Sequence, residues 1–526
     1  MTRSPLRSSL AVLAACAVLS ACGSTVQYSG TATVASHGDG LSGGTGGTTG
    51  SVSTTGSTTT GGLGSSTGLA GTSGSTGPSA GSTGASAAGS TTGAGTTGTS
   101  TTGSVLPAPG SGPATGRGFT RTTIRIGVAT ANDSNAYANS LGVKGVGYEG
   151  DPRIWYSALA AELNKSGGLL GRRVELVPYD FNTAQALSNP SAANQQACTA
   201  WTQDKPVFAV VLAAFGAEDT LLSCLAKTST PLIQVGAGLD YPLHYAEAYA
   251  KHPLYFNLAQ MAGDKYDAIA ISRLVARQFF SPWNTRTASP GTAATPVKVG
   301  LISFDDHDGD VQLASEQREL SKRGIKVATT IACPRPLAQK VSCSQSAVLR
   351  FNSAGVTHVF GADTVFMNNA NSQGYYPRFF VAVEPALIAA NTQPKSLSGA
   401  MGESYVPFLD VDTAQYPGDP SVATGVCKRI MKAAGQASSD PSTLWLQMSA
   451  CDGFFFVRDG IKAAGSLGPA ALRSGLEALG SRTPSALAFD TFLGPKDHAS
   501  ADGLRDLVYR ADAQNFAYVS RTTYRS

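Results

Sequence analysis

The sequence predicts an α/β fold with two doubly wound lobes, each built around a parallel sheet. Apolar runs without polar alternation recur between amphipathic helical segments, which is typical of parallel strands covered on both faces. This strand–helix rhythm starts a second time after a Pro- and Thr-rich loop at 281–296. The roughly 400 residues from Phe119 onward also exceed one ordinary hydrophobic core.

The expected elements alternate along the chain. The first unit opens with the strand TIRIGVAT (123–130) and the helix IWYSALAAELNKS (154–166). Its other expected strands are 173–180, 207–214 and 231–235, and its other helices are 191–203 and 219–229. A long helix at 264–280 leads to the second unit, with strands at 297–304, 326–332, 357–362 and 378–383 and helices near 311–323, 344–353 and 364–373. A further helix is expected at 442–456.

Residues 1–21 have the composition of a signal peptide. Arg3 and Arg7 supply positive charge, and Leu10–Leu19 is an apolar run too short to span a bilayer, which takes roughly 20 residues. The run ends in LSAC (19–22), which resembles the lipobox of bacterial lipoproteins. That resemblance implies a lipid on Cys22, which would hold the mature chain in the bilayer at the extracytoplasmic face of the cell membrane.

Residues 22–118 are predicted to form a disordered tether between the lipid and a folded body at 119–526. From 38 to 115 the sequence is almost entirely Gly, Ser, Thr and Ala, without a charged residue after Asp39. Such a segment buries too little apolar surface to offset its loss of conformational entropy. A flexible chain of about 78 residues has a root-mean-square reach of roughly 50 Å.

Charge and motifs argue against several function classes. The formal net charge of +4 becomes +2 once Arg3 and Arg7 are removed, so no nucleic-acid partner is expected. The acidic segment DDHDGD (305–310) lacks the spacing of an EF-hand, and no metal or other cofactor is expected. No nucleophile stands beside a convincing acid–base partner, and we therefore expect a binding protein instead of an enzyme.

The body contains six cysteines, and an even count in an exported chain favours disulfide bonds. They are Cys198, Cys224, Cys333, Cys343, Cys427 and Cys451. The first two and the last two lie on consecutive expected helices, and the middle two would close a short loop. Pairing of chain neighbours is therefore favoured, although six cysteines allow 15 connectivities and buried free thiols are the alternative.

Several segments carry a family resemblance through their order and spacing. They are IRIGVAT, the helix end and turn AAELNKSGGLLGRRVELVPYD, the strand FAVVLAA and the segment TPLIQVGAG, followed by KVGLISFDDHDGDVQLASEQRELSKRGIKV (298–327) and QGYYPRFFVAVEPAL (373–387). In this order they resemble the periplasmic solute-binding proteins of the leucine/isoleucine/valine-binding type, also called type I binding proteins. The resemblance covers nearly all of 120–526.

The resemblance implies a Venus-flytrap protein, in which two lobes joined by a three-segment hinge close on one small molecule. Lobe 1 would comprise about 120–259 and 408–504, and lobe 2 about 260–407 and 505–526. The protein, expected to be a monomer, would deliver an amino acid, an amide or a related organic compound to the permease subunits of an ABC transporter. A surface sensor of the same fold and, less favoured, an exported hydrolase are the alternatives.

The resemblance also places ligand contacts in loops at the carboxyl ends of strands, where open α/β sheets bind ligands. In lobe 1 the residues at these places are Tyr137, Phe215, Gly216, Ala217, Ala237 and Gly238. In lobe 2 they are Glu384 and Asp308, of which Asp308 departs from the family by lying near the position of its tyrosine. Glu384 matches the acid that holds the ammonium group of amino-acid ligands. Gly216 stands where the family has a serine, so the hydroxyl group is missing there. Phe215 would stack on the solute or pack inside its lobe.

Overall fold

The computed structural model describes residues 115–136, 148–213, 216–236, 245–382, 385–406, 411, 421–519 and 522–525. All of them belong to one compact unit, Thr99–Ser526. The predicted signal peptide, the lipidated Cys22 and nearly all of the tether lie outside the described residues. The description below therefore concerns the folded body alone.

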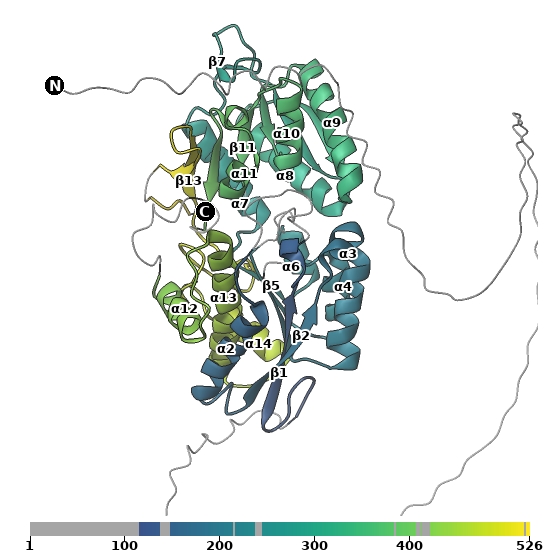
Figure 1. Ribbon diagram of the computed structural model, residues 1–526, viewed down its shortest axis with the longest axis vertical. Coiled ribbons are helices and arrows are strands. Elements are labelled where there is room, and N and C mark those ends of the chain that lie inside the picture. The colour runs from purple at the N-terminus through teal and green to yellow at the C-terminus, as the bar shows by residue number, and fades with distance from the viewer. Residues whose placement is uncertain are drawn as a thin grey trace, which may run out of the picture. The chain divides into compact units, whose positions relative to one another are not determined.

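A five-stranded parallel sheet forms the centre of lobe 1 (Figure 1). Its strands, in spatial order, are β2 (Arg173–Asp180), β1 (Thr123–Thr130), β3 (Ala209–Ala213), β4 (Leu232–Val235) and β5 (Tyr255–Leu258). Every residue of β3, β4 and β5 is buried, as expected for apolar strands that helices cover on both faces.

Helices pack on both faces of this sheet. A core on one face contains residues of α3 (Thr183–Ser188), α4 (Pro190–Thr199), the π-helical turn Ala200–Asp204, α5 (Asp219–Lys227) and α6 (Ala246–Lys251). The other face is covered by α2 (Pro152–Lys165), α12 (Val422–Ala433), α13 (Pro441–Ala464) and α14 (Pro469–Glu477). Helix α13 packs directly on β3 and β4, so a segment from late in the chain completes lobe 1.

The turn after α2 explains the glycines of NKSGGLLGRR. The helix ends at Lys165, and Gly168 adopts a positive φ of 71°. A Cβ atom on Gly168 would lie 2.0 Å from the carbonyl oxygen of Arg172, so no side chain fits there. The chain can therefore reverse within a few residues and enter β2.

Lobe 2 contains a seven-stranded sheet whose larger part is parallel. Its order is β14 (Asn515–Tyr518), β13 (Arg505–Arg510), β12 (Met401–Ser404), β11 (Arg378–Val381), β10 (His358–Phe360), β8 (Val299–Phe304) and β9 (Val327–Cys333). The pairs β12–β13 and β13–β14 are antiparallel, which the sequence did not reveal. The short turn from β13 to β14 can join only antiparallel neighbours, because a parallel pair needs a long crossover.

The helices of lobe 2 also cover both faces of its sheet (Figure 1). They are α7 (Gly263–Ala276), α8 (His307–Lys322), α9 (Leu337–Ala354), α10 (Thr364–Ser372) and α11 (Pro385–Asn391), with a 3-10 turn at Pro394–Leu397. A small hairpin of β6 (Trp283–Asn284) and β7 (Ser289–Pro290) follows α7. One core lies against α9 and α10, and a second, on the side of α7 and α8, is continuous with the α2–α13 core of lobe 1.

The chain passes between the two sheets three times: after β5, after β12 and before β13. The first and third passages are bonded to each other. The amide of Ala259 donates to the hydroxyl oxygen of Ser500 at 2.9 Å, and the amide of Ala501 donates to the carbonyl of Gln260 at 2.8 Å. Lys265, at the start of α7, adds an ion pair of 2.7 Å to Asp502.

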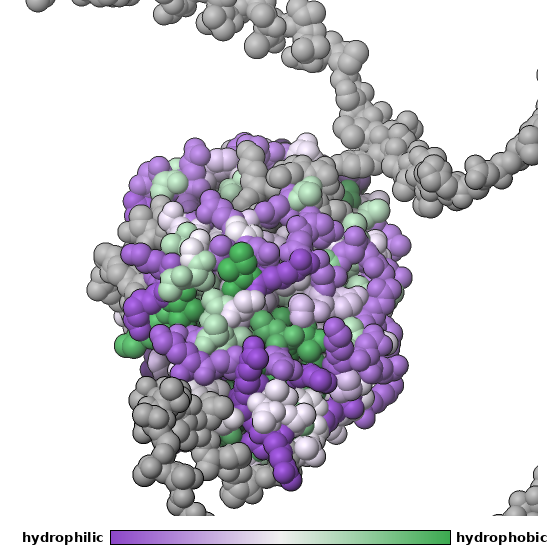
Figure 2. Space-filling view, turned by 60° about the horizontal axis from the view of Figure 1, so that its bottom comes forward, coloured by the Kyte–Doolittle hydropathy of each residue, from purple (hydrophilic) through white to green (hydrophobic). Residues whose placement is uncertain are grey.

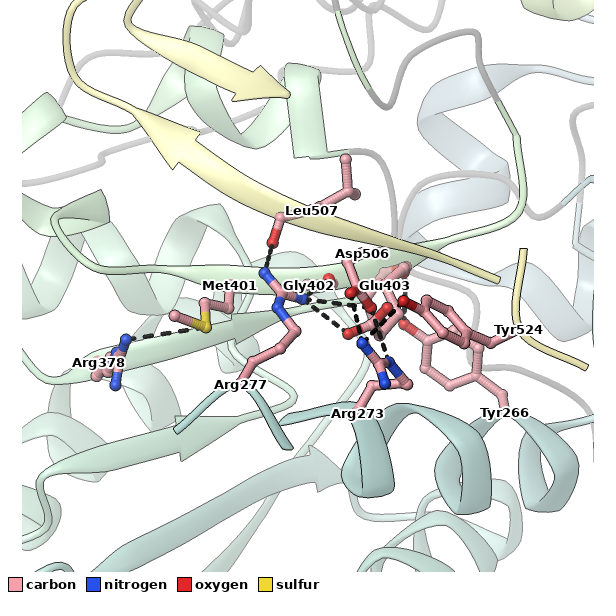
Figure 3. A network of polar contacts seen from close by, with 11 residues as sticks. Tyr266, Arg273, Arg277, Arg378, Met401, Gly402, Glu403, Asp506, Leu507 and Tyr524 are labelled. Carbon is pink, nitrogen blue, oxygen red and sulfur yellow. Dashed lines mark hydrogen bonds and ion pairs between the residues drawn. The ribbon is translucent and has the colours of Figure 1, made fainter. Parts of the chain in front are cut away.

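A polar network fastens α7 to the antiparallel edge of the lobe 2 sheet (Figure 3). Nη1 of Arg277 lies 2.8 Å from Oε1 of Glu403 on β12, and Nη2 of Arg273 lies 2.8 Å from Oδ2 of Asp506 on β13. Arg273 also donates to the hydroxyl of Tyr524 at 2.9 Å. Burial raises the pKa of Glu403 to about 9, and Arg277 opposes that shift.

Three disulfide bonds join the cysteines that are neighbours along the chain. They are Cys198–Cys224, Cys333–Cys343 and Cys427–Cys451. The first links α4 to α5, the second links the end of β9 to α9, and the third links α12 to α13. The expectation of disulfides is confirmed, with the connectivity that chain proximity favoured.

The surface of the body is largely hydrophilic on the face that Figure 2 shows, with smaller hydrophobic groups between the polar residues. Large exposed apolar residues such as Ile154, Leu349 and Val422 belong to separate helices. Among the described helices, none combines the length and the apolar character needed to cross a membrane. The apolar residues are therefore concentrated in the cores of the two lobes.

Candidate ligand-binding site

A pocket of about 550 Å³ lies between the two lobes and is called the interlobe pocket below. Its lining residues fall in the segments 188–191, 218–222 and 245–252 of lobe 1 and 305–311 and 335–336 of lobe 2. These segments follow β2, β3, β4, β8 and β9, so the pocket lies at carboxyl ends of strands in both sheets. Its volume falls within the range of roughly 300–1,000 Å³ that small-molecule sites occupy.

The lobe 1 wall contains an ion-pair cluster at the start of α5. Oδ1 of Asp219 lies 2.8 Å from Nζ of Lys251 and 3.0 Å from Nε2 of His252, at the end of α6. Partial burial opposes ionisation of Asp219, but hydrogen bonds from Lys251 and His252 outweigh it and lower the pKa of the carboxyl group. The negative charge of Asp219 is therefore well compensated.

Glu218, one residue earlier in the sequence, has a different electrostatic environment from Asp219. Its carboxylate accepts a hydrogen bond of 3.4 Å from the hydroxyl of Ser191. Burial raises the pKa of Glu218; Arg335 of lobe 2 lowers it, and Asp306 and Asp308 raise it further. The carboxyl group of Glu218 thus lies within electrostatic reach of the opposite wall.

The lobe 2 wall is organised around Arg335. Its guanidinium group contacts the carboxylate of Asp306, lies 3.9 Å from that of Asp308, and stacks 4.2 Å from the ring centroid of Phe304. Asp306 also caps α8 by accepting the amide hydrogen of Gly309 at 2.9 Å. One cation therefore serves two carboxylates.

Two contacts connect lobe 1 loops to lobe 2. Nε2 of His307 lies 3.1 Å from Oε1 of Glu247, and both side chains are exposed. Tyr245, which precedes α6, donates its hydroxyl hydrogen to Oδ2 of Asp267 on α7 at 3.2 Å. The ring of Tyr245 packs so closely on Gly263 that a Cβ there would lie 2.5 Å from it.

The described part of the predicted site divides into two groups. Asp308 lines the interlobe pocket. Gly216 and Ala217 are buried, and the amide of Ala217 donates to Oε1 of Gln234 at 3.2 Å. Their assignment as ligand contacts stays a prediction.

The other predicted ligand contacts lie outside the described residues. They are Tyr137, Phe215, Ala237, Gly238 and Glu384. Within the described ranges, no group of three or more His, Cys, Asp or Glu side chains is arranged to hold a metal ion.

Sequence reasoning missed Arg335, Tyr245 and His252 as pocket residues. Arg335 follows the edge strand β9, and the rule that ligands lie beyond carboxyl ends of strands would have pointed to it. Tyr245 and His252 flank the short helix α6, which the sequence pattern did not predict. Their position in the site depends on contacts with α5 and α7 that are distant in sequence.

Comparison with known proteins agrees with this architecture. The sequence profile of the periplasmic binding protein family matches residues 156–505. No curated protein sequence matches the chain. Solved structures show the same fold at low sequence identity, which confirms the predicted type I periplasmic binding protein fold.

Three of these solved structures show how similar their folds are to that of this chain. A periplasmic binding protein type 1 from Bordetella pertussis has a TM-score of 0.52 at 15% identity, covering 75% of this chain and 99% of its own. A branched chain amino acid ABC transporter protein from Thermus thermophilus with bound valine has a TM-score of 0.51 at 12% identity, covering 77% and 97%. A solute binding protein from R. palustris in complex with 4-hydroxybenzoate has a TM-score of 0.52 at 14% identity, also covering 77% and 97%. Because the family profile extends over most of both lobes, the chain belongs to the periplasmic binding protein family.

Proposed function

We propose that this protein captures a small organic solute in the interlobe pocket and delivers it to the permease subunits of an ABC transporter. The observation that carries the proposal is that both lobes supply lining residues, such as Glu218 from lobe 1 and Asp308 from lobe 2. A solute that contacts both walls binds the closed arrangement more tightly than the open one, and therefore shifts the population towards it. Structures of this fold with bound valine and 4-hydroxybenzoate support a small organic molecule as the class of ligand.

The proposal includes attachment to the membrane through Cys22, with 22–118 as a tether, about 120–259 and 408–504 as lobe 1, and about 260–407 and 505–526 as lobe 2. The segment LSAC (19–22) supports the lipid anchor. Such an anchor would keep a carrier close to its permease. Mass spectrometry of the processed protein should find a lipid on Cys22, and Cys22→Ser should release the protein from the membrane fraction. Retention of Cys22→Ser on the membrane would contradict the anchor.

The capture function is tested by thermal unfolding of the full-length protein against a library of metabolites. A true ligand present at 100 times its Kd should stabilise the folded state by about 2.7 kcal/mol. Small-angle X-ray scattering on the same sample should show a smaller radius of gyration with ligand than without it. Chemical conversion of the stabilising compound would instead favour an enzyme.

A further inference from the structure

We propose that the interlobe pocket selects an organic cation, a small molecule that carries a protonated amine or guanidinium group. This inference rests on the proposed function and deepens it by naming the charge class of the solute.

Acidic side chains outnumber basic ones around the pocket. The described residues of its lining include six carboxylates, from Glu218, Asp219, Glu247, Asp305, Asp306 and Asp308. Lys251 and Arg335 are the two Lys or Arg residues of the described lining. The whole chain has the opposite balance, with 39 Lys and Arg against 35 Asp and Glu. The acidic lining is therefore a local property that the composition of the chain does not explain.

The cations of the lining already have carboxylate partners. Lys251 is bonded to Asp219 at 2.8 Å, and Arg335 is shared between Asp306 and Asp308. Within the described residues, Glu218 and Asp305 form no ion pair. Neither carboxyl group has a Lys or Arg side chain of the described lining within ion-pair distance.

The uncompensated charge lies on both sides of the pocket. Glu218 stands on the lobe 1 wall, and Asp305 stands on the lobe 2 wall. Like charges that approach as two lobes close repel each other, and the repulsion grows as water leaves the space between them. A cation bound between the walls attracts the carboxylates on both walls, so that its presence favours closure. An anionic solute would add to the repulsion.

His252 provides a second, independent observation. Its side chain lines the pocket and is buried, with the residue only 5% exposed. In the neutral tautomer that donates its Nε2 hydrogen to Asp219, the lone pair of Nδ1 is an acceptor. Nδ1 is buried and has no hydrogen-bond partner among the described residues. In this tautomer a ligand N–H group is the partner that Nδ1 lacks.

The pocket fits an organic cation better than a metal ion. The described residues offer no cluster of three metal-ligating side chains, and the volume of about 550 Å³ is far larger than a bare ion needs. Apolar side chains also line it, including those of Leu222, Val311 and Pro336. The chemistry therefore matches an amine with a hydrocarbon body, whose charged end faces the carboxylates.

The test uses isothermal titration calorimetry and thermal unfolding of the full-length protein with five probes. Two are cations with N–H donors, 1,4-diaminobutane and agmatine; choline is a cation without them; leucine is a zwitterion and succinate an anion. We expect the two amines to bind, choline to bind at least tenfold more weakly because it has no N–H hydrogen to donate to the carboxylates, and succinate not to bind. Raising the salt concentration should weaken amine binding.

Two charge variants test whether amine binding depends on the carboxylates of the pocket. Glu218 makes no side-chain capping bond to α5, so Glu218→Gln should fold normally, which circular dichroism can verify. We expect it to weaken amine binding at least tenfold. The matched control is Asp310→Asn, which removes one exposed carboxylate from the first turn of α8 outside the pocket lining. It should leave the affinity unchanged within about twofold, because its carboxylate lies outside the pocket lining and solvent screens its charge from the ligand.

The outcomes separate this inference from the proposed function. If leucine or succinate stabilises the protein and neither amine does, the charge class is wrong while solute capture stands. If Asp310→Asn weakens amine binding as much as Glu218→Gln, the attraction is a general field effect and the site assignment is wrong. If no probe and no library compound binds, the inference and the proposed function are both wrong.

Discussion

The hydroxyl group of Tyr245 lies 3.2 Å from Oδ2 of Asp267, so that a residue lining the interlobe pocket is hydrogen-bonded to the first helix of lobe 2. Next to it, the amide of Ala246 donates to Oδ1 of Asp264 at 2.9 Å. The start of α6 is therefore bonded to α7 through two carboxylates. The position of this part of the lobe 1 wall therefore depends on hydrogen bonds to residues of lobe 2.

We expect Tyr245→Phe to lower the free energy of unfolding by about 1–2 kcal/mol, because Asp267 is buried and would lose a donor. The substitution keeps the ring that packs on Gly263. The measurement is urea denaturation followed by circular dichroism. Tyr509→Phe is the control, since the described residues offer no hydrogen-bond partner to that hydroxyl. Equal losses in the two variants would show that the Tyr245–Asp267 bond contributes nothing specific.

Stability should fall as the pH rises from about 5 to about 8. Burial raises the pKa of Asp267 on α7 to about 7 and that of Glu316 on α8 to about 8, and the charge of Asp267 raises the pKa of Glu316 further. The folded state therefore holds protons that the unfolded chain releases near pH 4, the ordinary range of a carboxyl group. Their contribution to stability is fully present below that pH, and it is lost as the pH rises through the folded-state values.

Glu316→Gln should flatten this pH dependence, because it removes one of the two titrating groups while keeping the hydrogen-bonding shape. Denaturation midpoints between pH 5 and 8 measure the slope. Asp512→Asn is the control, since that exposed carboxyl group has its pKa lowered by Arg510 and should leave the slope in this range unchanged. An unchanged slope in Glu316→Gln would rule out this pair as the source.

Arg277→Met should destabilise lobe 2 by about 3 kcal/mol or more, because it leaves several buried acceptors without a donor, beginning with the carboxyl group of Glu403. The guanidinium group also donates to the carbonyl oxygens of Gly402 and Leu507, and these bonds would be lost too (Figure 3). The measurement is the unfolding free energy from chemical denaturation. Arg510→Met, which breaks the exposed pair with Asp512, should cause no measurable change. Similar losses in both variants would contradict the role of burial.

The disulfide Cys333–Cys343 should influence solute affinity as well as stability. It closes the segment that contains Arg335, so replacing both cysteines by serine frees the guanidinium group that lies between Asp306 and Asp308. We expect a loss of about 3 kcal/mol in stability from the chain-entropy estimate and a severalfold weaker Kd.

The control for that prediction is the double serine variant of Cys427–Cys451, which joins α12 to α13 away from the pocket lining. It should lower the melting temperature while leaving the Kd unchanged. Both Kd values are measured by calorimetry with a ligand found in the thermal screen. If removal of Cys333–Cys343 changes only the melting temperature, the link between that disulfide and the pocket is wrong.

The parallel core of the fold could be predicted because its patterns are local. The strand expected at 123–130 is β1 residue for residue, and the strand expected at 207–214 contains β3. Short elements were missed. Helix α3 has six residues, and its start is fixed by a side-chain cap from Asn182 that a periodicity of apolar residues does not detect. The strands β13 and β14 were also missed, because they are short edge strands with charged and polar residues interspersed.

The candidate site was predicted only in part, for a different reason. Asp308 was expected at the site because it belongs to the segment after β8, a strand with a clear pattern, and it lines the interlobe pocket. The chemistry around it depends on Arg335, which comes from the next strand end, and on Glu218, which comes from the other lobe. Such contacts across the fold leave no trace in local periodicity. Three-dimensional proximity had to supply them.

Each of the three disulfide bonds joins two elements of the same lobe, and together they use all six cysteines of the body. Disulfide formation therefore constrains each lobe separately, and no disulfide bond links lobe 1 to lobe 2. The opening and closing that the proposed function requires is therefore not restrained by a disulfide bond. The stability of each lobe and the relative motion of the two lobes therefore depend on different bonds, so that a change in one need not alter the other.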